Sequence, residues 1–427
     1  MDKISAYRIA FYWAMTVKLI SQELVDQNPE TQSGFRSGHS CSTALLNVTD
    51  SILRALDEGL CTILVLLDYS KAFDTLNHQT LGVILRYIGL DPSAISFFDN
   101  YLHNRRQRVV MEGSISEYSL VSRGVPQGSV LGPILYNIYT SAFPGFLLNC
   151  KTQMYADDTQ LFYSFQHSKI QEACNLINKD LNILNRISQE HCLQLNPAKC
   201  VSILFGRPVP SQFQLKINDV CIPVRKEVKS LGVIVDERLR FESHISLCIK
   251  KSISILKLLY DSRHFLDSKT KRLLCDSLVL SVFNYCDVVY GPCLTSATAQ
   301  RIQKVQKCCL RFIYGIRRRQ RVSYKLKEAG WLDMKTRRFF HRCVLFHKII
   351  VVKCPRYLYL KITFRTDVHN LNLRFKGTLT PPAHRTATFE RSFTYDIAKT
   401  FNSLSDPLKS LSIFSFRKYL KRQLLCK

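Results

Sequence analysis

The feature that most constrains the fold is an unbroken apolar run at residues 61–67 (CTILVLL), which ends in Asp68. A run of apolar and β-branched residues without alternating polar positions is typical of a strand that is buried on both faces. Such a strand needs neighbouring strands at its edges and other structure over its faces. The chain is therefore expected to contain a central sheet, with Asp68 where one buried strand ends.

The segments that follow predict helices and strands in a definite order. A Gly/Pro-punctuated loop is expected at 122–133, and it leads into an apolar helix. Helices are expected from about 40 to 59, at 77–88, at 92–104 and at 169–190, and strands at 152–155, 159–165 and 200–205. Counted from the first strand, the order is β-α-β-β-α-β, the plan of a mixed sheet with helices on one face.

Three carboxylates are expected to meet in that topology. Asp68 ends the first strand, and Asp157 and Asp158 lie at the turn between the next two strands. Clustered carboxylates repel one another unless a cation lies among them, and hard oxygen ligands select Mg²⁺ or Mn²⁺. Two such ions suit the displacement of a leaving group at phosphorus. An aspartate pair in a turn is a weak signal by itself, because aspartates also stabilise turns through local hydrogen bonds.

The charge is unevenly distributed along the chain. Of the net +27, residues 1–244 contribute nothing, with 23 basic and 23 acidic residues, whereas residues 245–427 hold 37 basic and 10 acidic residues. Such segregation indicates a polyanionic partner, with nucleic acid favoured over an acidic membrane surface. This basic part is expected to form helices at 245–260, 268–282, 297–314 and 334–350, with an irregular tail after Pro355.

Cysteine usage and hydropathy bear on the compartment. None of the sixteen cysteines forms a Cys-x-x-Cys pair, so free thiols in a reducing compartment are expected, and the set Cys343, His347 and Cys354 matches no standard zinc spacing. No stretch of 18 uninterrupted apolar residues is present, so neither a membrane span nor a secretory signal is expected. A nuclear or cytoplasmic location is expected. The arginines of 317–321 fit either a nuclear signal or an RNA-binding face.

Six segments, in order, resemble the motifs of reverse transcriptases, and more narrowly those of non-LTR retrotransposons of the LINE and jockey-like kind. The three palm motifs are matched by 67–74 (LDYSKAFD), 124–133 (GVPQGSVLGP) and 155–158 (YADD). A fingers motif is matched by 32–36 (QSGFR), the following palm motif by 193–199 (LQLNPAK) and the primer grip by 231–236 (LGVIVD). Upstream of residue 32 the family's Arg-Pro-Ile-Ser-type motif is missing, so an N-terminally truncated copy is expected.

The resemblance implies roles for the carboxylates and for Lys199. Asp68, Asp157 and Asp158 would hold two Mg²⁺ or Mn²⁺ ions, and the backbone carbonyl of Tyr69 would complete one coordination shell. Lys199 would donate a proton to the leaving pyrophosphate. Without the motif, Lys199 would be read as ordinary surface charge.

Other residues would bind the nucleotide. Phe73 would be a steric gate that leaves no room for a ribose 2′-hydroxyl, whereas outside the motif it would be read as a core aromatic. Gln127 and Gly128 would form the floor under the template base and the nucleotide, with glycine allowing close backbone approach. Arg36 would meet the triphosphate, and its alternative is a solvated arginine.

The implied fold is α+β: a right-hand polymerase with a ferredoxin-like palm, partial fingers, a helical thumb and a basic C-terminal region. The expected boundaries are 1–60 for the fingers, 61–240 for the palm, 241–315 for the thumb and 316–427 for the basic region. The implied function is an RNA-directed DNA polymerase that adds dNTPs to a DNA primer on an RNA template. The alternative is a catalytically inactive, truncated remnant that only binds nucleic acid.

Overall fold

The structure is a computed structural model that describes residues 29–208, 213–368 and 378–426. It is an α+β protein, as expected, and the chain divides into two compact units. Of the described residues, the sheet unit contains 29–39, Ile63–Ser202 and 213–224. The helical unit contains Ser40–Thr62, Ile203–Pro208 and the chain from Arg225 onward.

The central sheet has the strand order β13-β10-β1-β8-β7. With the short edge strand β13 set aside, the first strand lies between the last and the third, which is the ferredoxin-like arrangement of a β-α-β-β-α-β chain. The expected plan is therefore confirmed. The strands are β1 (Cys61–Leu67), β7 (Lys151–Tyr155), β8 (Asp158–Phe165), β10 (Val201–Phe205) and β13 (Val224–Arg225).

Strands β7 and β8 form an antiparallel hairpin with a two-residue turn. Tyr155 pairs with Asp158, so Ala156 and Asp157 make the turn, and Ala156 has a φ of 56°. The inward residues of the hairpin, among them Met154 and Leu161, are buried. The hairpin places the adjacent aspartates at one end of the sheet.

Helices of the sheet unit begin at capping residues. The Asn77 side chain accepts the backbone N–H of Thr80 at the start of α3, and Asp91 accepts that of Ser93 at the start of α4. In α6, the buried Asp180 accepts backbone N–H groups of the loop before β7, including Asn149 at 2.8 Å. The helices are α3 (His78–Tyr87), α4 (Pro92–Leu102), α5 (Gly132–Tyr139) and α6 (Ile170–Glu190), with 3₁₀ turns η1 (Phe143–Phe146) and η2 (His167–Lys169).

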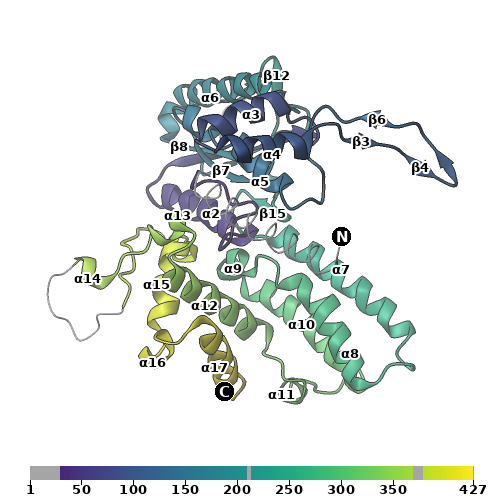
Figure 1. Cartoon of the computed structure of the whole chain (residues 1–427). Helices are drawn as coiled ribbons and strands as arrows, with labels where there is room; N and C mark the ends of the chain where they lie inside the picture. Colours follow the sequence, from purple (N-terminus) through teal and green to yellow (C-terminus); the bar gives the residue numbers. More distant parts are fainter. Residues whose placement is uncertain (1–28, 209–212, 369–377, 427) are drawn as a thin grey trace. The chain divides into compact units, whose positions relative to one another are not determined.

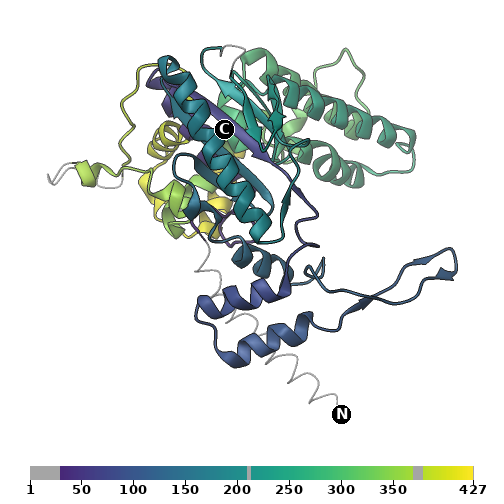
Figure 2. The same cartoon turned by 90° about the horizontal axis from the view of Figure 1, so that it is seen from above.

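A long hairpin, which we call the arm (residues 105–121), extends away from α3 and α4 in both views (Figures 1 and 2). Its strand residues are all exposed, including Val110 and Met111. The arm could not be predicted from the sequence, because each pairing is only two residues long and no core contact imposes an alternating pattern. The arm is built from β3 (Arg106–Gln107) with β6 (Ser119–Leu120) and from β4 (Val110–Met111) with β5 (Ser114–Ile115).

Three further two-stranded pairings complete the strands. In the sheet unit, β2 (Tyr69–Ser70) pairs with β9 (Gln194–Leu195), and β11 (Leu215–Ile217) pairs with β12 (Val220–Ile222). In the helical unit, β14 (Glu227–Ser230) pairs with β15 (Val233–Asp236). The last hairpin contains most of the segment that resembles the primer grip.

The helical unit follows the predicted helices closely except at one place. The helix expected at 268–282 begins as α8 and then changes into a π turn and a 3₁₀ turn. Its elements up to residue 352 are α2 (Cys41–Asp57), α7 (Glu242–Asp261), α8 (Ser268–Leu274), η3 (Cys275–Val279), η4 (Leu280–Phe283), α9 (Asp287–Tyr290), η5 (Gly291–Cys293), α10 (Ser296–Tyr314), α11 (Lys325–Glu328) and α12 (Met334–Val352).

The tail after Pro355 is more regular than predicted. Phe393, Ile397 and Phe401 form one buried stripe of a helix, and Phe416 with Leu420 forms another. The expectation was wrong because each helix is short and presents only a few apolar residues. The elements are α13 (Arg356–Tyr359), α14 (Arg365–Val368), η6 (Phe389–Arg391), α15 (Phe393–Asn402), α16 (Asp406–Lys409) and α17 (Ile413–Cys426).

Helix α2 is tied to this tail by buried carboxylates. Asp50 accepts the backbone N–H of Thr394 at 2.9 Å and pairs with Lys361 Nζ at 2.9 Å. Asp57 accepts the backbone N–H of Thr386 at 2.7 Å and that of Arg385 at 3.0 Å. These carboxylates can be buried in the interface because each accepts hydrogen bonds from the tail.

The cysteines and His347 lie in surroundings that bear on the expected absence of a zinc site. All sixteen cysteines are free thiols, as expected. His347 is buried and stacks on Phe416 at 4.0 Å, so it is a core residue. Across the described ranges, no single helix has the length and apolarity to cross a membrane, although the bent pair Ser268–Phe283 and Asp287–Cys293 together has both.

Candidate active site

The three predicted carboxylates lie on adjacent strands of the central sheet. Asp68 follows β1 directly, and Asp158 opens β8, the strand next to β1. Burial raises the pKa of Asp157, and the negative charge of Asp68 adds to the effect. Burial and the charges of Asp157 and Asp68 raise the pKa of Asp158 to about 6. The three groups therefore repel one another electrostatically, which is the condition that favours binding of a cation.

The described residues supply one cation beside this cluster. Lys199 Nζ lies 3.6 Å from Asp68 Oδ2, and that oxygen has no hydrogen-bond partner among the described residues. Within the same residues, no group of three or more His, Cys, Asp or Glu side chains lies close enough together to hold a metal ion as it stands. The oxygen donors are of the type that Mg²⁺ prefers, and a coordination shell would require them to draw together.

The segment around Lys199 fixes the backbone after Asp68. Tyr69 pairs with Leu195 between β2 and β9, and the backbone N–H of Asn196 donates to the carbonyl of Asp68 at 2.8 Å. The Tyr69 side chain is buried with its hydroxyl 3.1 Å from Ser188 Oγ, and burial raises its pKa. The Tyr69 side chain thus serves the core, which leaves its backbone carbonyl for the predicted role.

Phe73 is positioned by two other aromatic rings. It stacks on Tyr136 with ring centroids 4.4 Å apart and meets Phe35 edge to face at 6.3 Å. Tyr136 is fully buried, and burial raises the pKa of its hydroxyl, with contributions from Tyr69, Asp157 and Asp158. Tyr136, a residue of α5, therefore holds Phe73 near the carboxylates. Phe73 was predicted from the sequence, whereas Tyr136 was not, although Tyr136 lies in the predicted apolar helix.

Gln127 and Gly128 lie in the loop before α5. Gln127 donates from Nε2 to Asp74 Oδ1 at 2.9 Å, which links this loop to the segment after β1. Gly128 has a φ of 79°, and nothing lies within 4 Å of where a Cβ would stand. In this structure glycine is needed there for its left-handed backbone, and no close neighbour requires it.

Arg36 makes backbone contacts in the structure. One guanidinium nitrogen donates to the carbonyls of Pro29 at 2.9 Å and Gln32 at 3.1 Å, and Nε has no partner among the described residues. Arg36 therefore stabilises its own loop, while other N–H donors of its guanidinium stay available. Its contact with a triphosphate remains a prediction.

Residues 32–34 support the aspartate turn, a role that was not predicted from the sequence. Gln32 Oε1 accepts the backbone N–H of Ala156 at 2.9 Å, and Asn137 donates to the carbonyl of Gly34 at 2.8 Å. A Cβ on Gly34 would lie 2.3 Å from the Ala156 nitrogen. Only glycine fits so close to the turn that carries Asp157. The motif was visible in the sequence, but Ala156 lies 124 residues after Gln32.

Comparison with known proteins identifies the family of this chain. Residues 2–235 match the family described as reverse transcriptase (RNA-dependent DNA polymerase). The chain is 28% identical over 298 residues to the probable RNA-directed DNA polymerase from transposon BS of Drosophila melanogaster, covering 67% of this chain and 32% of that protein. It is 29% identical over 287 residues to the RNA-directed DNA polymerase from mobile element jockey of Drosophila funebris, covering 64% and 31%.

These matches cover only part of each relative. The chain spans about a third of the length of these curated relatives. Among solved structures, apo telomerase from Candida tropicalis, truncated from its C-terminal domain, aligns with 54% of this chain and 45% of that chain at 13% identity and a TM-score of 0.40. Because that score is low, we draw nothing from this pair.

Proposed function

Because this chain belongs to the reverse transcriptase family, whose members share the right-hand polymerase fold, we propose that it is the RNA-directed DNA polymerase of a non-LTR mobile element. Its substrates would be dNTPs, a DNA primer and an RNA template. These are nuclear and cytoplasmic molecules, so either compartment suits the proposed activity. The division into fingers (1–60), palm (61–240), thumb (241–315) and basic region (316–427) is part of the same proposal.

One observation carries the proposal: the coupled carboxylates on neighbouring strands. Burial raises the pKa of both hairpin aspartates, Asp157 and Asp158, and the negative charge of Asp68 adds to the effect. Such a site binds a divalent cation more strongly than three separate surface carboxylates would. Reverse transcriptases depend on divalent metal, so the cluster agrees with the family.

We assign Asp68, Asp157 and Asp158, with the carbonyl of Tyr69, as ligands of two Mg²⁺ or Mn²⁺ ions. When bound, these ions would activate the primer 3′-hydroxyl and neutralise the charge on pyrophosphate. Lys199, now beside Asp68, would be free to approach the pyrophosphate once Asp68 is neutralised by metal. Its ammonium group could then donate the proton that the leaving group takes up.

Nucleotide selection is assigned to the aromatic group around Phe73. Its ring is held by Tyr136 and Phe35, so it cannot easily rotate away from an incoming sugar. We propose that this fixed ring excludes the ribose 2′-hydroxyl. Gln127 and Gly128 would lie under the template base and nucleotide, and Arg36 would contact the triphosphate with its remaining donors.

The test is primer extension on poly(rA)·oligo(dT) with Mg²⁺, using the full chain. Asp157→Ala should lower the rate by roughly 10²–10³-fold, the size expected for losing one preorganised electrostatic group. Asp219→Ala is the matched control, because Asp219 is exposed in the β11–β12 turn and should leave the rate unchanged. Equal rates for the two variants would contradict the metal assignment.

A second outcome would favour the alternative. If the folded wild-type chain binds RNA but extends no primer with either Mg²⁺ or Mn²⁺, the chain acts as a nucleic-acid-binding remnant. Circular dichroism and an RNA-binding titration on the same preparation separate that outcome from simple misfolding.

A further inference from the structure

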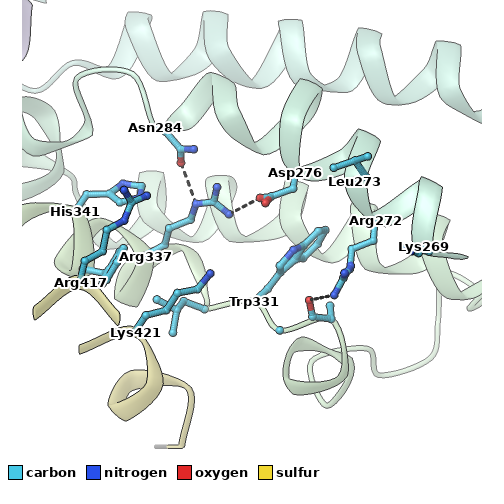
Figure 3. A pocket seen from close by; sticks show the side chains of 14 residues that line it. Lys269, Arg272, Leu273, Asp276, Asn284, Trp331, Arg337, His341, Arg417 and Lys421 are labelled. Carbon is cyan, nitrogen blue, oxygen red and sulfur yellow. Dashed lines mark hydrogen bonds and ion pairs between the residues drawn. The ribbon is translucent and has the colours of Figure 1, made fainter. Parts of the chain in front are cut away.

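The helical unit contains a pocket of about 520 Å³ whose walls come from α8, α12, α17 and the segment after α11 (Figure 3). That volume lies within the range of roughly 300–1,000 Å³ that is typical of ligand sites. Its polar walls carry mostly nitrogen donors. The cationic lining residues are Lys269, Arg272, Arg337, Arg417 and Lys421.

The pocket has a strong excess of positive charge. Five cationic side chains face one carboxylate, that of Asp276, so the formal charge is +4 with His341 neutral. Asp276 itself is paired with Arg337 at 2.8 Å and cannot neutralise the others. Cations gathered in a hollow raise the local concentration of anions more than the same charges spread on a flat surface.

Arg337 is held in place before any ligand arrives, and the exposed Arg272 is anchored by one hydrogen bond. Arg337 donates from Nε to Asn284 at 2.9 Å and from Nη1 to Asp276 at 2.8 Å, and its side chain is only 15% exposed. Arg272 donates from Nη1 to the carbonyl of Ala329 at 3.2 Å. A guanidinium has five N–H donors, so each arginine keeps several for a ligand. Fixed guanidinium forks match the oxygens of phosphate well.

The other three cations are also exposed, and no hydrogen bond or salt bridge is found for their side chains within the described parts of the chain, although Lys269 lies close enough to Asp267 to interact with its charge. Lys269 comes from α8, and Arg417 and Lys421 come from successive turns of α17. Figure 3 shows Arg417 and Lys421 extending from α17 toward Arg337. Long, exposed cations around a preorganised arginine are suited to an extended anion that continues beyond the pocket.

We propose that this pocket binds the phosphodiester backbone of RNA, as a contact separate from the carboxylate site. The inference rests on the proposed function in one respect, because it takes as ligand the RNA that the enzyme would copy. Arg337 and Arg272 hold one phosphate inside the pocket, and Lys269, Arg417 and Lys421 contact neighbouring phosphates of the strand. Binding of this kind reads no base sequence.

The test compares two double variants of α17 in the otherwise intact chain. Arg417→Gln with Lys421→Gln removes two pocket cations, whereas Lys418→Gln with Arg422→Gln removes two exposed cations of the same helix that do not line the pocket. Both variants have the same net charge. The affinity for single-stranded poly(rA) is measured by fluorescence anisotropy without Mg²⁺ or dNTPs, between 50 and 200 mM salt.

The pocket variant should show a salt slope shallower by about 1.4, since each lost phosphate contact on a single strand contributes about 0.7. The control variant should keep the wild-type slope. Equal slopes for both variants would overturn the proposal. In a second arm, tripolyphosphate is added to each protein and the melting temperature is followed. A rise in the wild type only, with unchanged RNA slopes, would assign the pocket to a free polyphosphate and overturn RNA as its ligand.

This design separates the two hypotheses, because binding needs no catalysis. A chain that extends no primer but loses salt dependence only in the pocket variant would refute the polymerase and support the pocket. A chain that extends primers, with equal salt slopes for the two α17 variants, would support the polymerase and refute the pocket.

Discussion

Gly34 offers the sharpest test of how the aspartate turn is held. In Gly34→Ala, the new Cβ would lie 2.3 Å from the Ala156 nitrogen, whereas ordinary contact begins at 3.4 Å. The two segments must therefore separate by about 1.1 Å. Both are backbone, so no flexible side chain can absorb the displacement.

The separation breaks the hydrogen bonds that join the two segments. Ala156 N–H to Gln32 at 2.9 Å, Gln32 Nε2 to the Ala156 carbonyl at 3.3 Å and Ser33 N–H to the Met154 carbonyl at 2.8 Å would all be strained or lost. At about 0.5–1.5 kcal/mol each, the free energy of unfolding should fall by about 1.5–4.5 kcal/mol. A shift of about 1 Å at Asp157 should also slow catalysis by about 10²-fold.

The assay is urea unfolding followed by primer extension at a temperature where the variant is fully folded. Gly145→Ala serves as the control, because Gly145 is exposed and nothing lies within 4 Å of its added Cβ. Wild-type stability and rate in Gly34→Ala would refute the idea that this contact positions the turn. A loss of stability with an unchanged rate would limit the role of Gly34 to folding.

Three further predictions follow from the site and from α2. Phe73→Ala should raise the ratio of ribonucleotide to deoxynucleotide incorporation about tenfold or more, and an unchanged ratio would remove Phe73 as the gate. Mg²⁺ at ten times its Kd should stabilise the wild type by about 1.4 kcal/mol in thermal unfolding and should not stabilise a protein carrying both Asp157→Ala and Asp158→Ala. Burial acts to raise the pKa of Asp57, but hydrogen bonds from Thr386 and Arg385 outweigh it and lower that pKa below 3.8. The ionised Asp57 therefore stabilises the fold above pH 3.8 and loses this effect as the pH falls through its folded pKa. Asp57→Asn should have a lower melting temperature than the wild type at pH 7, and the difference between the two melting temperatures should become smaller in acid. A difference that stays constant across the acid range would contradict the stabilising role of the ionised Asp57.

The central sheet could be predicted because its signals are local and redundant. Residues 61–67 are apolar at almost every position, and the hairpin of β7 and β8 lies at an aspartate turn, so strand type and order followed from short windows. The resemblance then supplied the roles of Asp68, Asp157 and Asp158. What the structure adds is their electrostatic coupling and the position of Lys199 beside Asp68.

Long-range supports could not be predicted in the same way. Gln32 and Gly34 act on Ala156, and Phe73 rests on Tyr136, but no periodicity links residues so far apart in the chain. The helices of the tail were missed because their apolar residues are few and their partners are distant. The pocket cations come from segments that only the fold brings together.

The pairing of α2 with the tail also determines when, during synthesis, this part of the helical unit can fold. Asp50 and Asp57 find their donors on residues that lie 311 to 344 positions later in the chain. At about 5–20 residues per second, a ribosome needs roughly 15–60 s to make the 300 or so residues between them. During that interval α2 has no native partner on the tail, and its two carboxylates remain hydrated. The contacts between α2 and the tail can therefore form completely only after residue 394 has been made, and a nascent chain that stalls before that residue leaves Asp50 without its Thr394 donors.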